Sequence, residues 1–400
     1  MFELLKGLTV VEGASFIAGP SCGLHLAQMG AKVIRIDKIG GGPDSKRWPL
    51  SKQGDSFYRQ GLNHNKLSIS LDFSQPEGRE LAQQLATGGD GLFVTNFPVR
   101  GFLSYDKLKE MRDDLICLRV MGWADGAPAM DYTINAAIGY PDMTGPAGEA
   151  EPVNHVLPAW DLYAGAYGAF ALMAAERDRK LNGKGREIQL SLADLAAVTM
   201  GNMGNVAEVL ESGIDRPKYG NDLYGAFGRN FVTSDGERIM LVAITPRQWT
   251  TLIKVLELEA EISQIETEIG QSFLRDEGTR FTHRDRLMPL FEKTIAARSY
   301  AELREKFDAN GVTWSRYQTL TQAFDEDPRF FTDNPIFSSV SHPGGHTYPT
   351  PGAPARIPGE KRIDAGSAPE IGQDTEQVLA DHLGFSGAQI GKLKDAGVVG

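Results

Sequence analysis

The sequence predicts an α/β protein with a mostly parallel sheet in a large domain and a second, smaller α+β domain. Residues 1–125 alternate strand-like and helix-like segments, and the strand-like segments are rich in Val, Ile and Leu. The chain has 400 residues, which is more than one simple hydrophobic core usually organises. After residue 225 the pattern changes to a hairpin followed by amphipathic helices.

The amino-terminal elements follow one another in a strand–helix rhythm. Strands buried on both faces are continuous apolar runs, whereas surface helices repeat apolar residues every three to four positions. This rhythm is typical of a Rossmann-like parallel sheet, which binds ligands beyond the carboxyl ends of its strands. The expected strands are Leu8 to Glu12, Lys32 to Asp37, Ser68 to Phe73, Gly91 to Asn96 and Leu115 to Met121, and the expected helices are Gly19 to Met29, Pro76 to Thr87 and Tyr105 to Asp113.

The stretch from Val156 to Asp194 contains a long helix with an unusual composition. Asp161 precedes the apolar-periodic run, where we expect the N-cap of the helix. The helix is rich in Ala and Gly, so another backbone can approach it closely. We expect Asn182-Gly183 to end it and Glu187 to Leu192 to form a buried strand.

The second domain is expected after a Gly- and Tyr-rich linker, Lys218 to Phe227. Asn230 to Ile244 is a hairpin turning at Asp235-Gly236, a strong two-residue turn signal. We expect a large domain over 1–225, a small domain over 226–330, and a return segment, 331–400, that completes the large domain. The helices expected in the small domain are Trp249 to Leu258, Arg284 to Ala297 and Ala301 to Asn310.

Composition narrows the classes of function. The net charge of −11 and the pI of about 5.2 argue against a nucleic-acid or membrane-surface partner. Cys22 and Cys117 lie in apolar surroundings and indicate buried thiols in a reducing compartment. No signal peptide or membrane span is evident, so we expect a cytoplasmic enzyme.

The turn after the first strand suggests a nicotinamide dinucleotide site as an alternative. The required G-x-G-x-x-G is absent between Gly13 and Gly19, and the bulky Phe16 and Ile17 would obstruct a pyrophosphate. No G-x-x-x-x-G-K-[ST] occurs, which excludes a P-loop. The seven histidines show no metal-ligand spacing, so we expect no metal site.

Linked motifs along nearly the whole chain resemble those of the family III CoA-transferases. They are Ala18-Gly19-Pro20, Val33 to Asp37, Asn65 to Asp72, Pro76-Glu77-Gly78, Thr95-Asn96-Phe97, Asp161 with the Ala/Gly-rich helix, and Ile371 to Thr375. The resemblance implies that Asp161 is the catalytic nucleophile and that coenzyme A, as part of the substrate, is the only cofactor. It also implies an interlocked-ring homodimer.

A CoA site needs cations for the phosphates and an apolar slot for the adenine. Lys38, Arg47 and Lys66 follow or flank the expected strand ends, although each could instead be a surface charge. The resemblance places Asn96 and Phe97 against CoA, and Tyr132 near the ligand. Phe97 is alternatively a core residue. For the carboxylates of the acyl group we expect contacts from Ser15, Asn135 and Arg47.

Several segments resemble in particular the members that move CoA between the C1 and C4 carboxyls of mesaconate. They are Gly40 to Asp44 with Arg47-Trp48-Pro49, Asp131 to Ala137, Pro152 to Asp161, Tyr219 to Asn221 with Tyr224 to Arg229, and Thr245 to Trp249. The resemblance implies attack of Asp161 on the thioester of mesaconyl-CoA, a mixed anhydride, and an aspartyl-CoA thioester. The net reaction is an isomerisation.

Other members of the family differ at diagnostic positions. Ile17 replaces the Gln of formyl-CoA transferases, and Ala243 to Pro246 replaces their glycine run. Met130 replaces the His of the related racemases, and we expect the nearby His155 to be structural. The alternatives left open are an intermolecular CoA transferase, a racemase or dehydrogenase, and a non-catalytic CoA-binding protein.

Overall fold

The computed structural model describes residues 1–400, which form two compact units. The large unit contains residues 1–138, 155–213 and 329–400. The small unit contains residues 139–154 and 214–328. Residues 139–154 and 214–225 thus belong to the small unit, although their position in the sequence suggested the large domain.

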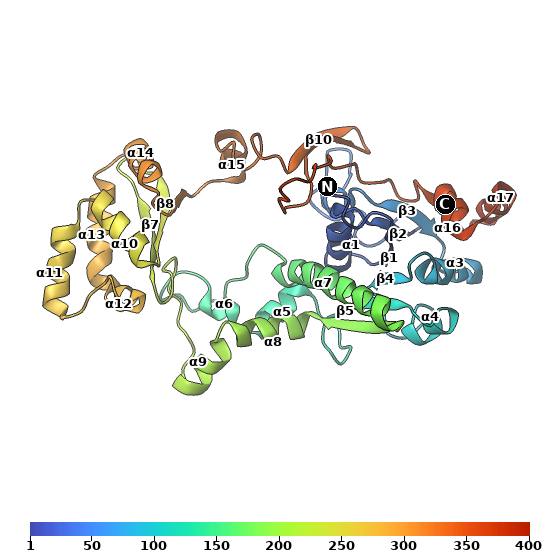
Figure 1. Ribbon diagram of the computed structural model, residues 1–400, viewed down its shortest axis with the longest axis horizontal. Helices are drawn as coiled ribbons and strands as arrows, with labels where there is room; N and C mark the ends of the chain where they lie inside the picture. Colours follow the sequence, from blue (N-terminus) through green and yellow to red (C-terminus); the bar gives the residue numbers. More distant parts are fainter. The chain divides into compact units, whose positions relative to one another are not determined.

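A six-stranded, entirely parallel sheet forms the centre of the large unit (Figure 1). Its strands are β1 (Thr9–Gly13), β2 (Lys32–Lys38), β3 (Leu67–Leu71), β4 (Leu92–Thr95), β5 (Ile116–Met121) and β6 (Arg186–Ser191). The order is β3-β2-β1-β4-β5-β6, so the direction of strand succession reverses between β1 and β4. Loops at the carboxyl ends of these two strands flank the crevice where such sheets bind ligands. The expected α/β class and the positions of the expected strands are confirmed, but β6, expected to be buried, is an edge strand in which only Leu190 and Ser191 are buried.

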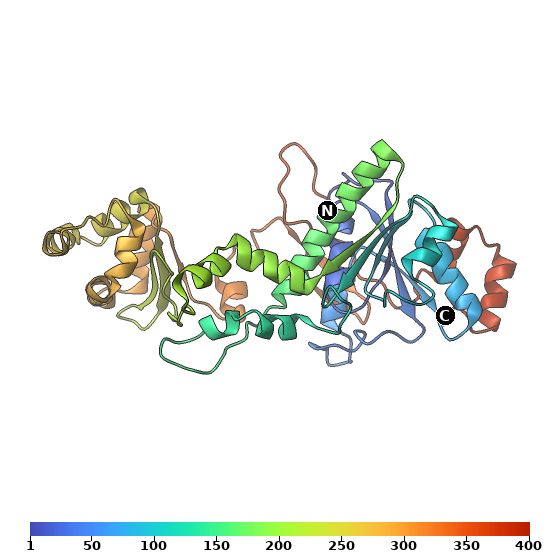
Figure 2. The ribbon, with the colours of Figure 1, turned by 90° about the horizontal axis from the view of Figure 1, so that it is seen from below.

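Helices cover both faces of this sheet. Figure 2 shows α1 and α7 on one face and α3, α4, α16 and α17 on the other. Apolar residues of the second set share one buried core with the strands, including Leu81, Leu108, Val378 and Ile390. The helices of the large unit are α1 (Ala18–Gln28), α2 (Phe57–Asn63), α3 (Pro76–Thr87), α4 (Tyr105–Met111), α5 (Asp131–Ala137), α7 (Ala159–Asn182), α8 (Leu192–Asn202), α9 (Asn205–Ser212), α16 (Thr375–Leu383) and α17 (Gly387–Asp395).

The contact between α1 and α7 depends on glycine. A Cβ added to Gly165 would lie 2.5 Å from Ser21 Oγ and 3.2 Å from the backbone oxygen of Ala18, both in α1. The expected close approach of another backbone to the Ala/Gly-rich helix is therefore confirmed. Gly183 ends α7 with a φ of 69°, as the Asn-Gly sequence predicts.

The return segment after residue 328 contains more regular structure than its Pro- and Gly-rich composition suggests. It forms an antiparallel hairpin of β10 (Phe337–His342) and β11 (His346–Pro351) before α16 and α17. The last residues reach the edge of the sheet, where Val399 forms a bridge with Leu71 of β3. This segment thereby joins the large unit.

The small unit is built on a three-stranded antiparallel sheet. Its strands are β7 (Phe227–Val232), β8 (Arg238–Ala243) and β9 (Trp314–Arg316), and its helices are α6 (Tyr140–Met143), α10 (Pro246–Val255), α11 (Glu259–Ile269), α12 (Glu277–Thr282), α13 (Arg284–Ala296), α14 (Tyr300–Asn310) and α15 (Leu320–Glu326). The hairpin turns at Asp235-Gly236 as expected, with a φ of 84° at Gly236. Phe227, Trp249 and Phe291 pack together in its core.

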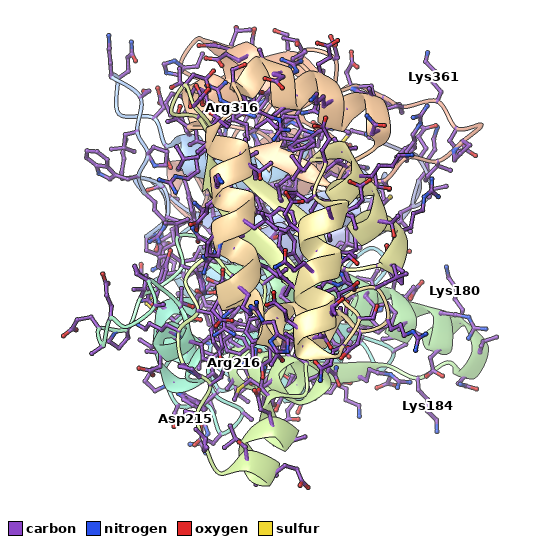
Figure 3. The ribbon with its side chains drawn as sticks, turned by 90° about the vertical axis from the view of Figure 1, so that its left-hand side faces the viewer. Lys180, Lys184, Asp215, Arg216, Arg316 and Lys361 are labelled. Carbon is purple, nitrogen blue, oxygen red and sulfur yellow. The ribbon has the colours of Figure 1, made fainter.

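Charged residues mark the surfaces of both units (Figure 3). In the small unit, Arg316 of β9 forms an ion pair with Glu237 at 2.8 Å. In the large unit, Lys180 and Lys184 are exposed around the carboxyl end of α7. No helix in the structure combines the length and the apolar character that crossing a membrane requires.

Candidate active site

The loop after β1 begins the site at the point where the strand order reverses. Ser15 N donates to Asn96 Oδ1 at 3.2 Å, and Asn96 Nδ2 donates to Ser15 O at 2.9 Å. Phe16 adopts a φ of 69°, which is unusual for a bulky residue, and its N–H donates to Asp44 Oδ2 at 3.2 Å. These contacts hold an unfavourable turn in a single shape, a feature often found at functional sites.

Beneath this turn lies a buried network of charges. Arg35 is 1% exposed and donates to Asp37, Glu12 and Asp44 at 2.8, 3.2 and 3.0 Å. Asp44 therefore links the network to the backbone of Phe16. Because every charge here has an opposite partner, the network gives the loop above it a rigid base.

Lys66 belongs to this network, which corrects its expected role in CoA binding. Its Nζ donates to Glu12 Oε2, Pro20 O and Asn63 Oδ1 at 2.8, 2.8 and 2.9 Å. An ammonium group has three protons, so none remains for a phosphate. Burial lowers the pKa of Lys66 to about 8, and Glu12 opposes that shift. The position of Lys66 beside a strand suggested a phosphate contact or a surface charge, but the long-range contact with Glu12 buries it.

Asp161 lies in the first turn of α7 and is partly buried. The prediction that it forms the N-cap is wrong, because the helix begins at Ala159 after Pro158, which provides no side-chain cap. Burial and the nearby charge of Asp131 raise the pKa of Asp161 to about 7, and Arg47 acts in the opposite direction. A carboxyl group with so strongly raised a pKa, shifted by burial and by a specific charged neighbour, is a candidate functional group.

Arg47 and Tyr58 lie beside Asp161. The Arg47 guanidinium is 5.0 Å from the centroid of the Tyr58 ring and 5.8 Å from that of Phe16. The Tyr58 hydroxyl is buried without a well-formed hydrogen bond. Burial raises its pKa to about 12, and the charge of Asp161 adds to that shift. Tyr58 therefore stays protonated and has a hydrogen to donate.

Helix α5 holds the start of α7. Asp131 Oδ2 accepts the N–H groups of Trp160 and Asp161 at 2.6 and 3.0 Å. Asn135, one turn later, accepts the Trp160 indole N–H at 3.3 Å. Asn135 was expected to contact the substrate, whereas the structure shows it supporting Trp160.

The remaining residues expected to contact CoA occupy different surroundings. Lys38 is exposed at the carboxyl end of β2. Phe97 is half-buried and packs edge-on against Phe73, with ring centroids 5.9 Å apart, next to the sheet core. Tyr132 is 40% exposed, and the centroids of its ring and the His155 ring are 6.3 Å apart. The structure brings Arg47 to Asp161, places Phe16 of the Ser15 turn next to Arg47, and leaves Lys38 and Tyr132 as exposed groups.

Sequence reasoning missed Tyr58 and the capping role of Asp131. Nothing in the local pattern around Tyr58 distinguishes it from an ordinary apolar helix residue. Asp131 had a signal that could have been used. It lies four residues before Asn135, a spacing that places both side chains on one face of a helix.

Comparison with known proteins gives consistent results. The sequence profile described as CoA-transferase family III matches residues 5–375. The chain is 45% identical over 403 residues to the 2-methylfumaryl-CoA isomerase of Chloroflexus aurantiacus, which covers 100% of this chain and 98% of that one. It is 27% identical to the human succinyl-CoA:glutarate CoA-transferase, covering 99% of this chain and 90% of the relative.

Among solved structures, a CAIB/BAIF family protein from Brucella suis superimposes with a TM-score of 0.76 at 25% identity, covering 95% of this chain and 100% of the other. The family match spans most of the sequence, and the motifs that suggested it lie in the folded elements described above. The chain belongs to CoA-transferase family III and is an enzyme that acts as a CoA transferase or isomerase.

Proposed function

We propose that this enzyme moves CoA between the C1 and C4 carboxyl groups of mesaconate, so that the net reaction is the isomerisation of 2-methylfumaryl-CoA. One observation carries the proposal. A partly buried carboxyl group, Asp161, lies at the start of α7 beside the cation Arg47 and the proton donor Tyr58. The full-length similarity to a 2-methylfumaryl-CoA isomerase supports the choice of acyl group.

The chemistry begins with Asp161 as an ionised nucleophile. Its carboxylate attacks the thioester carbonyl and expels CoA thiolate, leaving a mixed anhydride. The thiolate then attacks the aspartyl carbonyl, which yields an aspartyl-CoA thioester and free mesaconate. The other mesaconate carboxylate attacks this thioester, a second anhydride forms, and the thiolate returns to the substrate. The thioester is conserved, so no cofactor is required beyond the CoA of the substrate.

The released mesaconate is a dianion that must turn within the active site, so that its other carboxylate can react, without dissociating from the enzyme. Arg47 provides a positive charge near Asp161, and the Tyr58 hydroxyl provides an unused hydrogen-bond donor. In a partly buried site such donors interact more strongly with a carboxylate than in water. We therefore assign these two side chains to the carboxylate that is not reacting. The Ser15 turn borders the same site.

For CoA itself, Lys38 remains the candidate phosphate contact, because it is exposed at a strand end facing the ligand edge of the sheet. Asn96 supports the Ser15 turn, and Phe97 and Tyr132 are candidate walls of the CoA path. We place the reaction in the cytoplasm, where CoA thioesters and the free thiols of Cys22 and Cys117 are compatible.

We also propose that the enzyme is a homodimer. Exposed apolar side chains gather on three consecutive helices, α7, α8 and α9. They are Tyr163, Tyr167, Phe170, Val198, Val206, Val209 and Leu210. Monomeric proteins rarely leave this much apolar surface in water, and a second copy of the chain is the partner that the family suggests.

The test is to incubate the enzyme with mesaconyl-C1-CoA in the presence of carbon-13-labelled free mesaconate, and to separate the thioesters by chromatography. Formation of unlabelled C4 thioester supports the intramolecular reaction. Label in the product would instead show an intermolecular transferase, an activity named for the human relative that acts on succinyl-CoA and glutarate.

Asp161→Asn is the inactive variant expected from the mechanism. Asp194→Asn is its matched control, because Asp194 is also the third residue of a helix, α8, but lies exposed. If Asp161→Asn forms product as fast as the wild type, covalent catalysis by Asp161 is refuted.

A further inference from the structure

A side chain outside α7 caps its first turn. Asp131 is 1% exposed, and its Oδ2 accepts the backbone N–H groups of Trp160 and Asp161. Unpaired N–H groups at a helix start need acceptors, and Pro158 at the N-cap offers no side-chain oxygen. Asp131 therefore fixes the backbone from which the Asp161 side chain projects.

The same helix makes a second contact with this turn. Asn135 accepts from the Trp160 indole N–H at 3.3 Å. Together, Asp131 and Asn135 hold the backbone and the side chain of the residue next to Asp161. A displacement of α5 would thus move the nucleophile.

The other oxygen of Asp131 has no partner within the structure. Asp131 Oδ1 is buried and makes no hydrogen bond, so the negative charge of this group is only partly compensated. The charge of Asp131 in α5 raises the pKa of Asp161, and that of Arg47, in the loop after β2, lowers it. The charge of Asp161 in turn raises the pKa of Tyr58 in α2. The buried Asp131 and the partly buried Asp161 therefore repel each other when both are ionised, and the positive charge of Arg47 opposes this effect on Asp161.

We propose that Asp131 is a positioning residue that holds the reacting carboxylate through the backbone of α7 and, as a second buried anion, favours the acylated forms of Asp161 over its ionised form. The inference rests on the proposed function. When Asp161 becomes an anhydride or a thioester it loses its charge, and its repulsion by Asp131 disappears. The ionised enzyme is therefore destabilised relative to its covalent intermediates, which makes acylation more favourable.

Asp131→Asn separates the two effects. The amide oxygen of Asn can still accept both N–H groups, but the charge is gone. We expect the ratio of activity at pH 6 to activity at pH 8 to rise about threefold or more, because Asp161 ionises more easily without a neighbouring anion. The fraction of enzyme trapped by borohydride reduction as the aspartyl-CoA thioester should fall. Asp131→Ala, which also lacks the acceptor, should lose about tenfold more activity than Asp131→Asn.

Two comparison variants keep the interpretation specific. Asp276→Asn removes a capping carboxylate from the small unit, where Asp276 Oδ1 accepts from Gly278 N at 3.0 Å, and it should change neither readout. Trp160→Phe removes the indole contact to Asn135 and leaves both carboxylates, so it should lower activity without moving the pH profile.

Direct titration of Asp161 distinguishes failure of this inference from failure of the proposed function. The carboxyl carbons of all aspartates are labelled with carbon-13, and the Asp161 signal is identified by its absence in Asp161→Asn. A lower midpoint in Asp131→Asn supports the inference whatever the substrate is. An unchanged midpoint together with an unchanged trapped fraction would overturn it. If the wild type forms no thioester with mesaconyl-CoA, the proposed function fails while the titration still decides the role of Asp131.

Discussion

Replacing Gly165 by alanine tests how tightly α1 and α7 pack. The new Cβ would lie 2.5 Å from Ser21 Oγ and 2.6 Å from Ser21 Cβ, so the two helices must move apart. Overpacking of this kind costs about 1–3 kcal/mol. Alanine is favoured over glycine inside a helix by about 1 kcal/mol, which partly offsets the cost. The matched control is Gly391→Ala in α17, where an added Cβ meets no atom within 4 Å.

Stability is compared by denaturant unfolding at a single protein concentration, because oligomers unfold in a concentration-dependent way. We expect Gly165→Ala to be about 1–3 kcal/mol less stable than Gly391→Ala. Gly165 follows Asp161 by one helical turn, so turnover should also fall about tenfold as the proposed nucleophile is displaced.

The double variant Gly165→Ala with Ser21→Gly removes the clash and should recover much of both losses. Equal stability and activity of Gly165→Ala and Gly391→Ala would refute the close packing inferred for α1 and α7.

Three variants and a change of pH address the site and the surface. At pH 8, Asp161→Asn should be more stable than the wild type, and the difference should vanish below about pH 4. Burial and Asp131 raise the pKa of Asp161 to about 7, so the stability contributed by its protonated form is lost as the pH rises through that value. If Asp161 is the nucleophile, the wild-type kcat/KM should for the same reason increase about tenfold from pH 6 to pH 8. Lys66→Met should cost about 3–5 kcal/mol in unfolding experiments by leaving Glu12 with one buried cation fewer, but the folded variant should bind CoA like the wild type by calorimetry. Phe170→Asp, at a position 65% exposed in the chain, should give monomers in analytical ultracentrifugation; a dimer of unchanged affinity would exclude the α7 surface as the interface.

The sequence alone predicted the features that depend on neighbouring residues. The strands β1 to β6, the helix from Pro76 to Thr87 and the turn at Asp235-Gly236 all appear where the sequence pattern and turn chemistry placed them. Such signals depend on residues close together in the sequence, so tertiary packing changes them little. The motif around Asp161 was also visible because its members lie close together in the sequence.

The tertiary structure decided what those residues contact. Lys66 was an expected phosphate ligand, but its ammonium group instead donates a hydrogen bond to the buried Glu12, 54 positions away. Asp161 was expected to cap its own helix, whereas Asp131, 30 positions earlier, accepts the N–H groups of its first turn. A one-dimensional pattern records neither the depth of a side chain nor its distant partners. Those depend on how the sheet and the helices pack, and they determine which charges remain available for chemistry.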